Sequence, residues 1–163
     1  MANTKYELTD ETHSLNPRLR RIRALVDIPE AGVKAGDLGG WVETEANLSV
    51  YDSARVSGNA RVYGDARAQD RESILTAGPL SSEGDHGTLV RGTNAHIIVI
   101  GCWSGTTDGL RDLASSDKWP SRAGAEVRAK YAPRLIAFAA LCDAQIALWN
   151  DSPIIDRDAK EFE

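Results

Sequence analysis

Three near-identical hexapeptides follow one another in the middle of the chain and constrain its fold more than any other feature. They read VYDSAR from Val50, VSGNAR from Val56 and VYGDAR from Val62. An apolar residue recurs at positions 50, 56, 62, 68 and 74, alanine at 54, 60 and 66, and arginine at 55, 61 and 67. A fixed short period is typical of architectures in which successive repeats stack on one another.

This period predicts a short left-handed parallel β-helix. The aliphatic residues would point into the coil, so we expect burial of Val50, Val56, Val62 and Ile74. The alanines would fit where the wall is crowded. Gly58 and Gly64 would take the corners, where a positive φ costs little for glycine.

The same geometry predicts where the arginines lie. Stacking pairs residues three hexapeptides apart, so Arg55, Arg61 and Arg67 should be exposed on three different faces and form no basic groove. Residues 43–74 give fewer than two coils, and open coil ends favour pairing with other strands. We therefore expect a homodimer or homotrimer.

The segments before the repeat predict a β-hairpin formed by residues 5–13 and 19–26, with a turn at Asn16-Pro17 and the arginines of LRRIRALV largely solvated. A helix over 18–25 is an alternative, because arginine and leucine favour helices. The connection from Asp27 ends in Gly39-Gly40-Trp41. Two glycines before an aromatic residue predict a tight turn that lets Trp41 cover the end of a core.

The segments after the repeat predict strands at 74–80, 88–91 and 96–103, with a polar loop at 81–87. A short helix should run from an N-cap at Thr106 or Thr107 to Ala114. A helix over 121–131 should break or kink at Pro133. The following helix should bury one apolar face, formed by Leu135, Phe138, Ala139, Cys142, Ile146 and Trp149.

The fold class expected is therefore α+β, with an N-terminal β-hairpin, a β-helix-like segment, and a small β-hairpin followed by helices. The segments are a hairpin and cap at 1–42, the repeat at 43–74, a strand-and-helix binding domain at 75–150 and an acidic tail at 151–163.

Composition narrows the cellular setting. Of 163 residues, 42% are hydrophobic, which is enough for a core, and the net charge of −5 argues against direct nucleic-acid binding. The opening MANTKYELTDE has no apolar stretch of a secretory signal. Asp143 and Gln145 interrupt the apolar run 135–149, so we expect no membrane span. Cys102 and Cys142 are expected as buried free thiols, consistent with a cytoplasmic location in a bacterial host.

No residue pattern indicates catalysis. Acyltransferases and zinc carbonic anhydrases built on β-helices need histidines at the coil walls, whereas His13, His86 and His96 all lie outside the repeat. The chain has no P-loop and no G-x-S-x-G elbow. Cys102 lacks a nearby histidine, and two cysteines do not make a zinc site. We expect no enzyme activity, no metal and no cofactor.

The block KYELTDE…LRRIRAL…VKAGDLGGWVE…NLSVYDSARVSGNARVYGDAR resembles phage and prophage hexapeptide-repeat proteins, which join this opening to a variable number of A-R-V-x-G repeats. The second half, ILTAGPLSSEGDHGTLVR…VIGCWSGTTDGL, is similar to the C-terminal part of some members, which carries a GPIGSR-like turn and a GCFxG-like turn. The resemblance spans about residues 5–113 and implies a phage origin and a β-helix.

Two departures from these proteins matter. The repeat is shorter here, and residues 81–87 replace the arginine of the GPIGSR-like turn with Glu83 or omit it. If that arginine binds a ligand in the family, this chain would bind differently.

These observations predict a non-enzymatic phage accessory protein that binds a host component and antagonises a bacterial defence system. The partner would be a host protein complex or a small signalling nucleotide. A structural module that multimerises and presents the C-terminal domain is the alternative, and a residual acyltransferase-like enzyme is a third.

Candidate binding residues lie in the C-terminal half. Arg91, Trp103 and Tyr131 combine an arginine with aromatic faces, which suits a phosphate or carboxylate and a base. Thr106 and Thr107 precede a helix and would present backbone N–H groups to an anion. Ser81 and Ser82, in the 81–87 loop, are expected at the polar rim.

Overall fold

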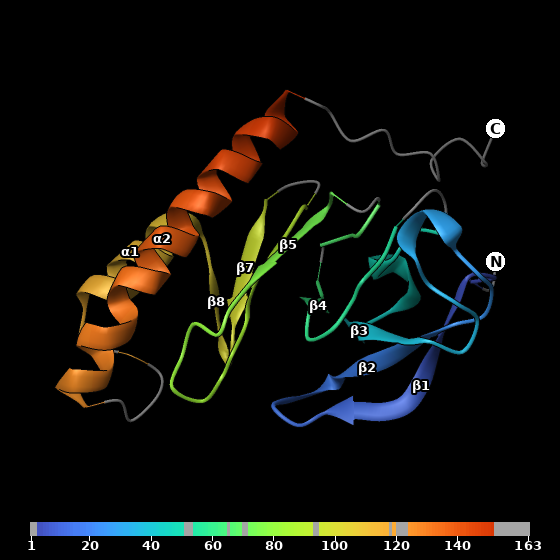
Figure 1. The fold of residues 1–163 in the computed structure, drawn as a ribbon, viewed down its shortest axis with the longest axis horizontal. Helices are drawn as coiled ribbons and strands as arrows, with labels where there is room; N and C mark the ends of the chain where they lie inside the picture. Colours follow the sequence, from blue (N-terminus) through green and yellow to red (C-terminus); the bar gives the residue numbers. More distant parts are fainter. Residues whose placement is uncertain are drawn as a thin grey trace.

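The structure, a computed structural model, describes residues 3–50, 54–64, 66–69, 72–92, 95–117, 119 and 124–151. These residues form two four-stranded sheets and two α-helices (Figure 1). Strands β1 to β4 make the first sheet, in that order, and strands β5 to β8 make the second. The predicted tail 151–163 lies outside the described residues, apart from Asp151.

The N-terminal hairpin confirms the strand interpretation over the helical alternative. Strand β1 (Tyr6–His13) pairs antiparallel with β2 (Asn16–Ala24). Strand β3 (Leu38–Val42) continues the sheet antiparallel to β2, and the short β4 (Arg61–Val62) lies parallel to β3. Two single-turn 3-10 helices, at Pro29–Ala31 and Glu45–Asn47, flank β3 in the chain.

The prediction of a tight turn at Gly39-Gly40 is wrong, because both glycines lie inside β3. A β-carbon on Gly39 would lie 2.6 Å from the Val56 carbonyl oxygen, and one on Gly40 would lie 2.6 Å from the Ala60 carbonyl oxygen. The missing side chains therefore let the repeat segment approach the strand backbone. The backbone N–H of Gly40 donates to the Val56 carbonyl at 2.8 Å.

The prediction of a left-handed parallel β-helix is also wrong. Both sheets are rich in antiparallel pairs, and the parallel pairing of β3 with β4 covers only Trp41 with Arg61 and Val42 with Val62. The described residues of the repeat pair with β3, with Leu48 and with Gly92, and among them no β-bridge joins one hexapeptide to another. A repeat too short to supply its own stacking partner thus pairs with β3, in a sheet whose other pairings are antiparallel.

Burial within the repeat follows the predicted period only in part. Val56 and Val62 are fully buried with Ala54, Ala60 and Ala66, and Gly58 and Gly64 have positive φ, as predicted. Val50 is exposed and Ile74 only half-buried, contrary to prediction. The arginines also differ from the prediction: Arg55 is exposed, Arg67 is half-buried and Arg61 is buried.

The second sheet is wholly antiparallel. Its strands are β5 (Ile74–Ala77), β6 (Gly87–Val90), β7 (Ile97–Ile100) and β8 (Trp103–Gly105). The single strand predicted over 96–103 instead folds back at Gly101, whose φ of +54° suits glycine, so that Ile100 pairs with Trp103. The turn between β7 and β8 brings Cys102 to the surface, contrary to its predicted burial.

Two helices cover one face of this sheet. Helix α1 (Thr107–Ser115) begins at the predicted N-cap Thr106. Helix α2 (Ala125–Asn150) runs through Pro133 without a break, so of the predicted break or kink at this residue the break is wrong; residues 121–123 of the predicted helix lie outside the described residues. Pro133 is exposed, and water can therefore reach the carbonyl that proline leaves without a donor.

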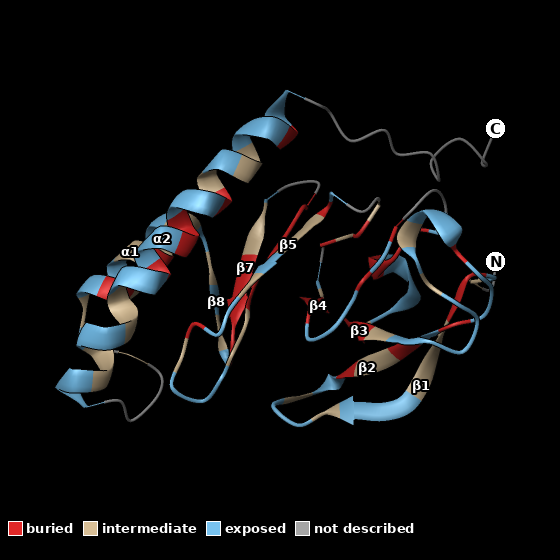
Figure 2. Cartoon of the chain, in the orientation of Figure 1, coloured by how far each residue is buried: buried red, intermediate tan, exposed pale blue. Residues whose placement is uncertain are grey.

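The apolar face predicted for α2 packs against the sheet. Leu135, Phe138, Ala139, Cys142 and Trp149 are buried in one core with strand residues of β6 and β7, and Figure 2 shows the buried positions of α2 turned toward the strands. By length and composition alone, α2 would also suffice to cross a membrane. The outer side of α2 is exposed.

Two buried arginines each join elements that are distant in the sequence. The Arg61 guanidinium, on β4, donates to the Gly101 carbonyl at 2.6 Å, and the Arg91 guanidinium, after β6, donates to the Trp149 carbonyl at 2.8 Å. The backbone N–H of Arg67 donates to the Arg91 carbonyl at 3.2 Å. The β1–β4 half is thus joined to the turn between β7 and β8 through Arg61.

Replacing Arg61 by Met should lower the free energy of unfolding by about 2–3 kcal/mol, because the Gly101 carbonyl loses a charged, buried donor. Urea unfolding measures the change. Arg18→Met, at a side chain 82% exposed, is the control and should shift the midpoint little. Equal midpoints for the two variants would contradict a bridging role for Arg61.

Candidate binding pocket

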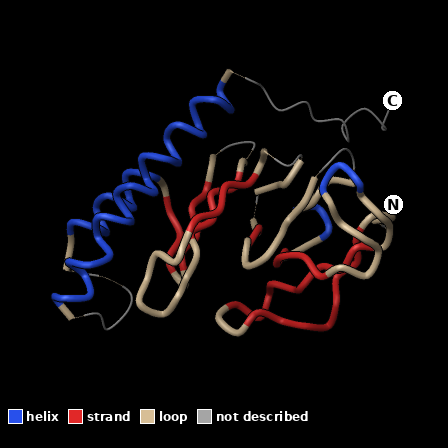
Figure 3. Tube along the Cα trace, in the orientation of Figure 1, coloured by secondary structure: helices blue, strands red, loops and turns tan. Residues whose placement is uncertain are grey.

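A pocket of about 360 Å³ opens where the two halves meet. Leu15 reaches it from the turn between β1 and β2, and the other lining residues come from the 80–85 loop, the β7–β8 turn, the two helices and Trp119. Figure 3 shows the tip of the β1–β2 hairpin near the loop that follows β5. This volume falls within the usual range of small-ligand pockets.

The lining is mainly apolar. Four leucines and one isoleucine contribute to it, together with two tryptophans; these are Leu15, Leu80, Ile100, Leu113, Leu135, Trp103 and Trp119. Trp103 and Trp119 are both half-buried, so neither indole is sealed in the core. The indole N–H of Trp119 is buried without an acceptor among the described residues.

The polar lining is acidic. Ser81, Glu83 and Asp85 lie on the loop between β5 and β6. The Ser81 hydroxyl donates to the Asp85 carboxylate at 2.8 Å and accepts from the backbone N–H groups of Glu83 and Asp85, at 3.2 and 3.1 Å. One serine therefore fixes the loop that presents both carboxylates. Within the described part of the chain, no cation forms an ion pair with the exposed Glu83.

Asp85 lies where the pocket meets the first sheet. A β-carbon on Gly101 would lie 2.8 Å from the Asp85 carboxylate, so the carboxylate sits directly against the β7–β8 turn. Burial lowers the pKa of Arg61, and the negative charge of Asp85 acts in the opposite direction. The negative charge of Asp85 thus favours the charged form of the buried Arg61 guanidinium.

His13 holds the hairpin tip on the opposite side. Its Nδ1 accepts a hydrogen bond from the Leu15 backbone N–H at 3.1 Å, and its ring meets the Trp41 ring edge-on, with centroids 4.9 Å apart. Burial and then the positive charge of Arg61 lower the pKa of His13, while Asp85 opposes them. The neutral imidazole is therefore favoured in the position that orients Leu15.

Two of the seven binding residues predicted from sequence line this pocket, namely Ser81 and Trp103. Ser82 is exposed beside them and does not line it. Thr106 is the cap of α1, its hydroxyl accepting from the Gly109 N–H at 3.1 Å. The Thr107 hydroxyl bonds Asp143, whose pKa is lowered mainly by its hydrogen bond with Arg111 and further by Thr107.

Neither Arg91 nor Tyr131 lines the pocket, and the two residues contact different partners. The Arg91 guanidinium lies over the Trp149 ring, 5.8 Å from its centroid, in addition to its bond to the Trp149 carbonyl. Tyr131 lies between Lys130 and Arg134 on α2. The structure therefore does not bring Arg91, Trp103 and Tyr131 together as one recognition surface.

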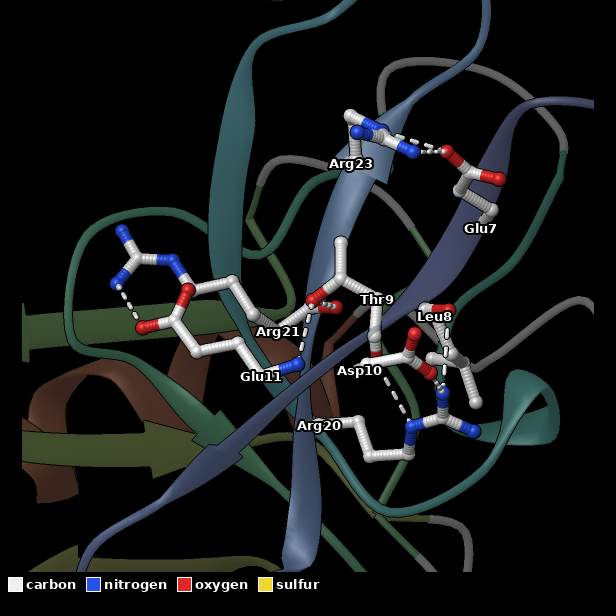
Figure 4. A network of polar contacts seen from close by, with 8 residues as sticks. All are labelled: Glu7, Leu8, Thr9, Asp10, Glu11, Arg20, Arg21 and Arg23. Atoms are coloured by element: carbon white, nitrogen blue, oxygen red, sulfur yellow. Dashed lines mark hydrogen bonds and ion pairs between the residues drawn. The ribbon is translucent and has the colours of Figure 1, made fainter.

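The basic run of β2 is balanced by acids of β1 (Figure 4). Arg20 pairs with Asp10, Arg21 with Glu11 and Arg23 with Glu7, across the hairpin. These arginines were expected to be largely solvated, but the neighbouring strand supplies their counter-charges. Such pairing leaves this hairpin without the unbalanced positive charge that phosphate backbones require.

Among the described residues, no group of three or more His, Cys, Asp or Glu side chains lies in a position to hold a metal ion. No family model matches the chain, and no curated protein or solved structure is similar to it.

The sequence indicated both turns that line the pocket, but it did not indicate that the two turns lie close together in the fold. The GPLSSEGD and GCW segments, noted for their similarity to two turns of phage proteins, supply Leu80 to Asp85 and Gly101 to Trp103. Leu15 and Trp119 carry no local signal, because only the tertiary fold brings them to these turns. In the sequence, Glu83 stood out as one possible replacement of an arginine, and in the structure Glu83 and Asp85 give the pocket its acidic side chains.

Lowering the pH from 7.5 to 5.5 should decrease the free energy of unfolding. Burial lowers the pKa of His13 and of His96 below 6.5, with Arg61 and Arg91 adding to the effect. As the pH falls, these histidines therefore bind protons in the unfolded chain at a higher pH than in the folded chain. The stabilisation that the neutral histidines give at pH 7.5 is lost toward pH 5.5. Urea titrations across this range measure the slope.

The double variant His13→Gln and His96→Gln should flatten this pH dependence. The range stays well above the region in which Asp143 titrates, so that carboxylate does not contribute. A slope as steep in the double variant as in the wild-type chain would contradict the assignment to these two histidines.

Proposed function

We propose that this chain is a binding protein, without catalytic activity, whose pocket takes a basic, partly apolar segment of a partner protein. The observation that carries the proposal is the pairing of two carboxylates, Glu83 and Asp85, with two half-buried tryptophans in one pocket. A lysine or arginine side chain matches this lining, because its aliphatic stem packs on apolar surface while its charged end meets a carboxylate.

Charge decides between the two partner classes expected from sequence. A nucleotide brings phosphates, which the Glu83 and Asp85 carboxylates repel, and the arginine once assigned to a phosphate, Arg91, bonds the Trp149 carbonyl elsewhere. Arg61, whose charge interacts with Asp85, is already bonded to the Gly101 carbonyl. Electrostatics therefore favour a cationic ligand over an anionic one.

The departure at Glu83 supports the same ligand charge. Where the resembling phage proteins carry an arginine in this turn, this chain replaces it with Glu83 or omits it, and the exposed Glu83 lines the pocket. In either case the turn has an acidic side chain and lacks the arginine, so it favours a positively charged ligand.

Trp119 favours a peptide over a simple amine. Its indole N–H is buried and lacks an acceptor among the described residues, so a ligand carbonyl would satisfy it. A peptide supplies such a carbonyl together with the basic side chain, and the aromatic faces of Trp103 and Trp119 supply the apolar contact that interfaces concentrate in a few residues.

The resemblance to phage and prophage proteins supports a host component as the partner. A small accessory protein that masks a basic segment of a host defence complex would block its contacts with nucleic acid or with other subunits. Antagonism of a bacterial defence is therefore the biological role that we propose for the pocket.

Three matched peptides test the pocket: acetyl-Leu-Lys-Leu-amide, acetyl-Leu-norleucine-Leu-amide and acetyl-Leu-Glu-Leu-amide. We expect the lysine peptide to bind tightest and the glutamate peptide weakest, as measured by calorimetry. Glu83→Gln should weaken lysine-peptide binding roughly fivefold, corresponding to about 1 kcal/mol. Glu30→Gln, at an exposed acid on the first 3-10 helix, is the control. Tighter binding of the glutamate peptide, or equal binding of lysine and norleucine, would refute the proposed ligand charge.

Native mass spectrometry after incubation with extract of a defence-carrying bacterium identifies the class of partner. A bound protein lost in Glu83→Gln supports the proposal, and a bound nucleotide contradicts it.

A further inference from the structure

Helix α2 has a second apolar face, opposite the one that packs on the sheet. The exposed residues of this outer stripe are Pro133, Ala137, Ala140, Leu141, Ala144 and Leu148. They recur at three- and four-residue spacings, which places them on one side of a helix. Leu141 is 47% and Leu148 64% exposed, and Figure 2 shows the outer side of α2 exposed along its length.

The stripe carries no charge between its two ends. Arg134 and Asp143 are the only charged residues of α2 between Lys130 and Asp151, and both are engaged away from the stripe. Arg134 donates to the Pro79 carbonyl at 3.2 Å, and Asp143 pairs with Arg111 of α1. A surface helix normally places polar residues opposite its buried face. The apolar composition of the outer stripe is instead that of a surface covered by a partner.

The ends of the stripe carry opposite charges. Lys130 lies one turn before Pro133, and Asp151 immediately follows the helix; both are exposed. If two α2 helices meet antiparallel with the two-fold axis between Ala140 and Leu141, Lys130 of each copy faces Asp151 of the other. In the same register, Pro133 faces Leu148 and Ala137 faces Ala144.

We propose that the outer stripe of α2 binds a second copy of this chain, forming an antiparallel two-fold homodimer. Such an interface is self-complementary, as two-fold symmetry requires, in both apolar pairing and charge. The alanines let the helix axes approach closely, and Leu141 and Leu148 fill the space beside them. This basis for association is independent of the repeat and of the proposed pocket function.

The contact extends over about 32 Å, from Lys130 to Asp151, at 1.5 Å per residue. A single helix pair lies at the small end of interface sizes, so we expect a dissociation constant in the micromolar range. The monomer of 17.6 kDa and a dimer of twice that mass should therefore exchange with concentration.

Sedimentation equilibrium of the full chain from about 1 to 200 μM tests the dimer. Leu141→Glu brings two carboxylates together at the axis and should weaken association at least about tenfold. Leu25→Glu, at a leucine 43% exposed after β2, is the matched control and should leave association unchanged. Circular dichroism verifies the fold of both variants. A wild-type monomer throughout, or a dimer insensitive to Leu141→Glu, would overturn the proposal.

Charge reversal tests the register. Lys130→Glu and Asp151→Lys should each weaken the dimer roughly threefold to tenfold, and the two together should restore it. Failure of the double variant to recover would refute the antiparallel arrangement. Flotation with phosphatidylcholine and phosphatidylglycerol vesicles distinguishes a lipid surface: a monomer that floats with vesicles through Leu141 also overturns the proposal.

Discussion

The pocket depends on a buried arginine that crosses from one half of the molecule to the other. Arg61 leaves the first sheet at β4 and donates to the carbonyl of Gly101, in the turn that ends one wall of the pocket. A buried guanidinium is tolerated only when its charge and N–H groups find partners. Gly101 provides a carbonyl and Asp85 an opposite charge, so Arg61 holds the β7–β8 turn, while Ser81 fixes the acidic loop.

A second connection acts at the other end of the sheet. Arg91 bonds the last turn of α2 through the Trp149 carbonyl, and the Trp149 indole N–H donates to the Glu72 carbonyl at 2.9 Å. Helix α2 is thereby attached both to its own sheet and to the segment that leads from the repeat into β5. The residue that the sequence suggested as a ligand anchor thus serves to position a helix whose Leu135 lines the pocket.

The sequence predicted local structure well and long-range pairing poorly. Periodicity and capping residues suffice for the N-terminal hairpin, the start of α1 and the buried face of α2, because each depends on neighbouring residues. The repeat correctly indicated that Val56 and Val62 point inward, but a period does not specify the partner, and here the partner is β3. Burial of Arg61 was unpredictable for the same reason: its position in the repeat is equivalent to that of exposed Arg55, and only the distant Gly101 distinguishes the two. The pocket combines residues from position 15 to position 135, so its turns were recognisable and its lining was not.

The two faces of α2 connect the proposed pocket with the proposed dimer. Leu135 lies on the buried face and lines the pocket, whereas Leu141 and Leu148 lie on the outer stripe. Because these faces are on opposite sides of one helix, a second copy of the chain on the stripe would leave both pockets open. A dimer would then present two acidic pockets to one partner assembly. Binding of the second pocket becomes intramolecular once the first is occupied, which raises the apparent affinity without a new contact. Host complexes that contain several copies of a basic segment are the targets for which such a two-pocket arrangement gives the greatest gain.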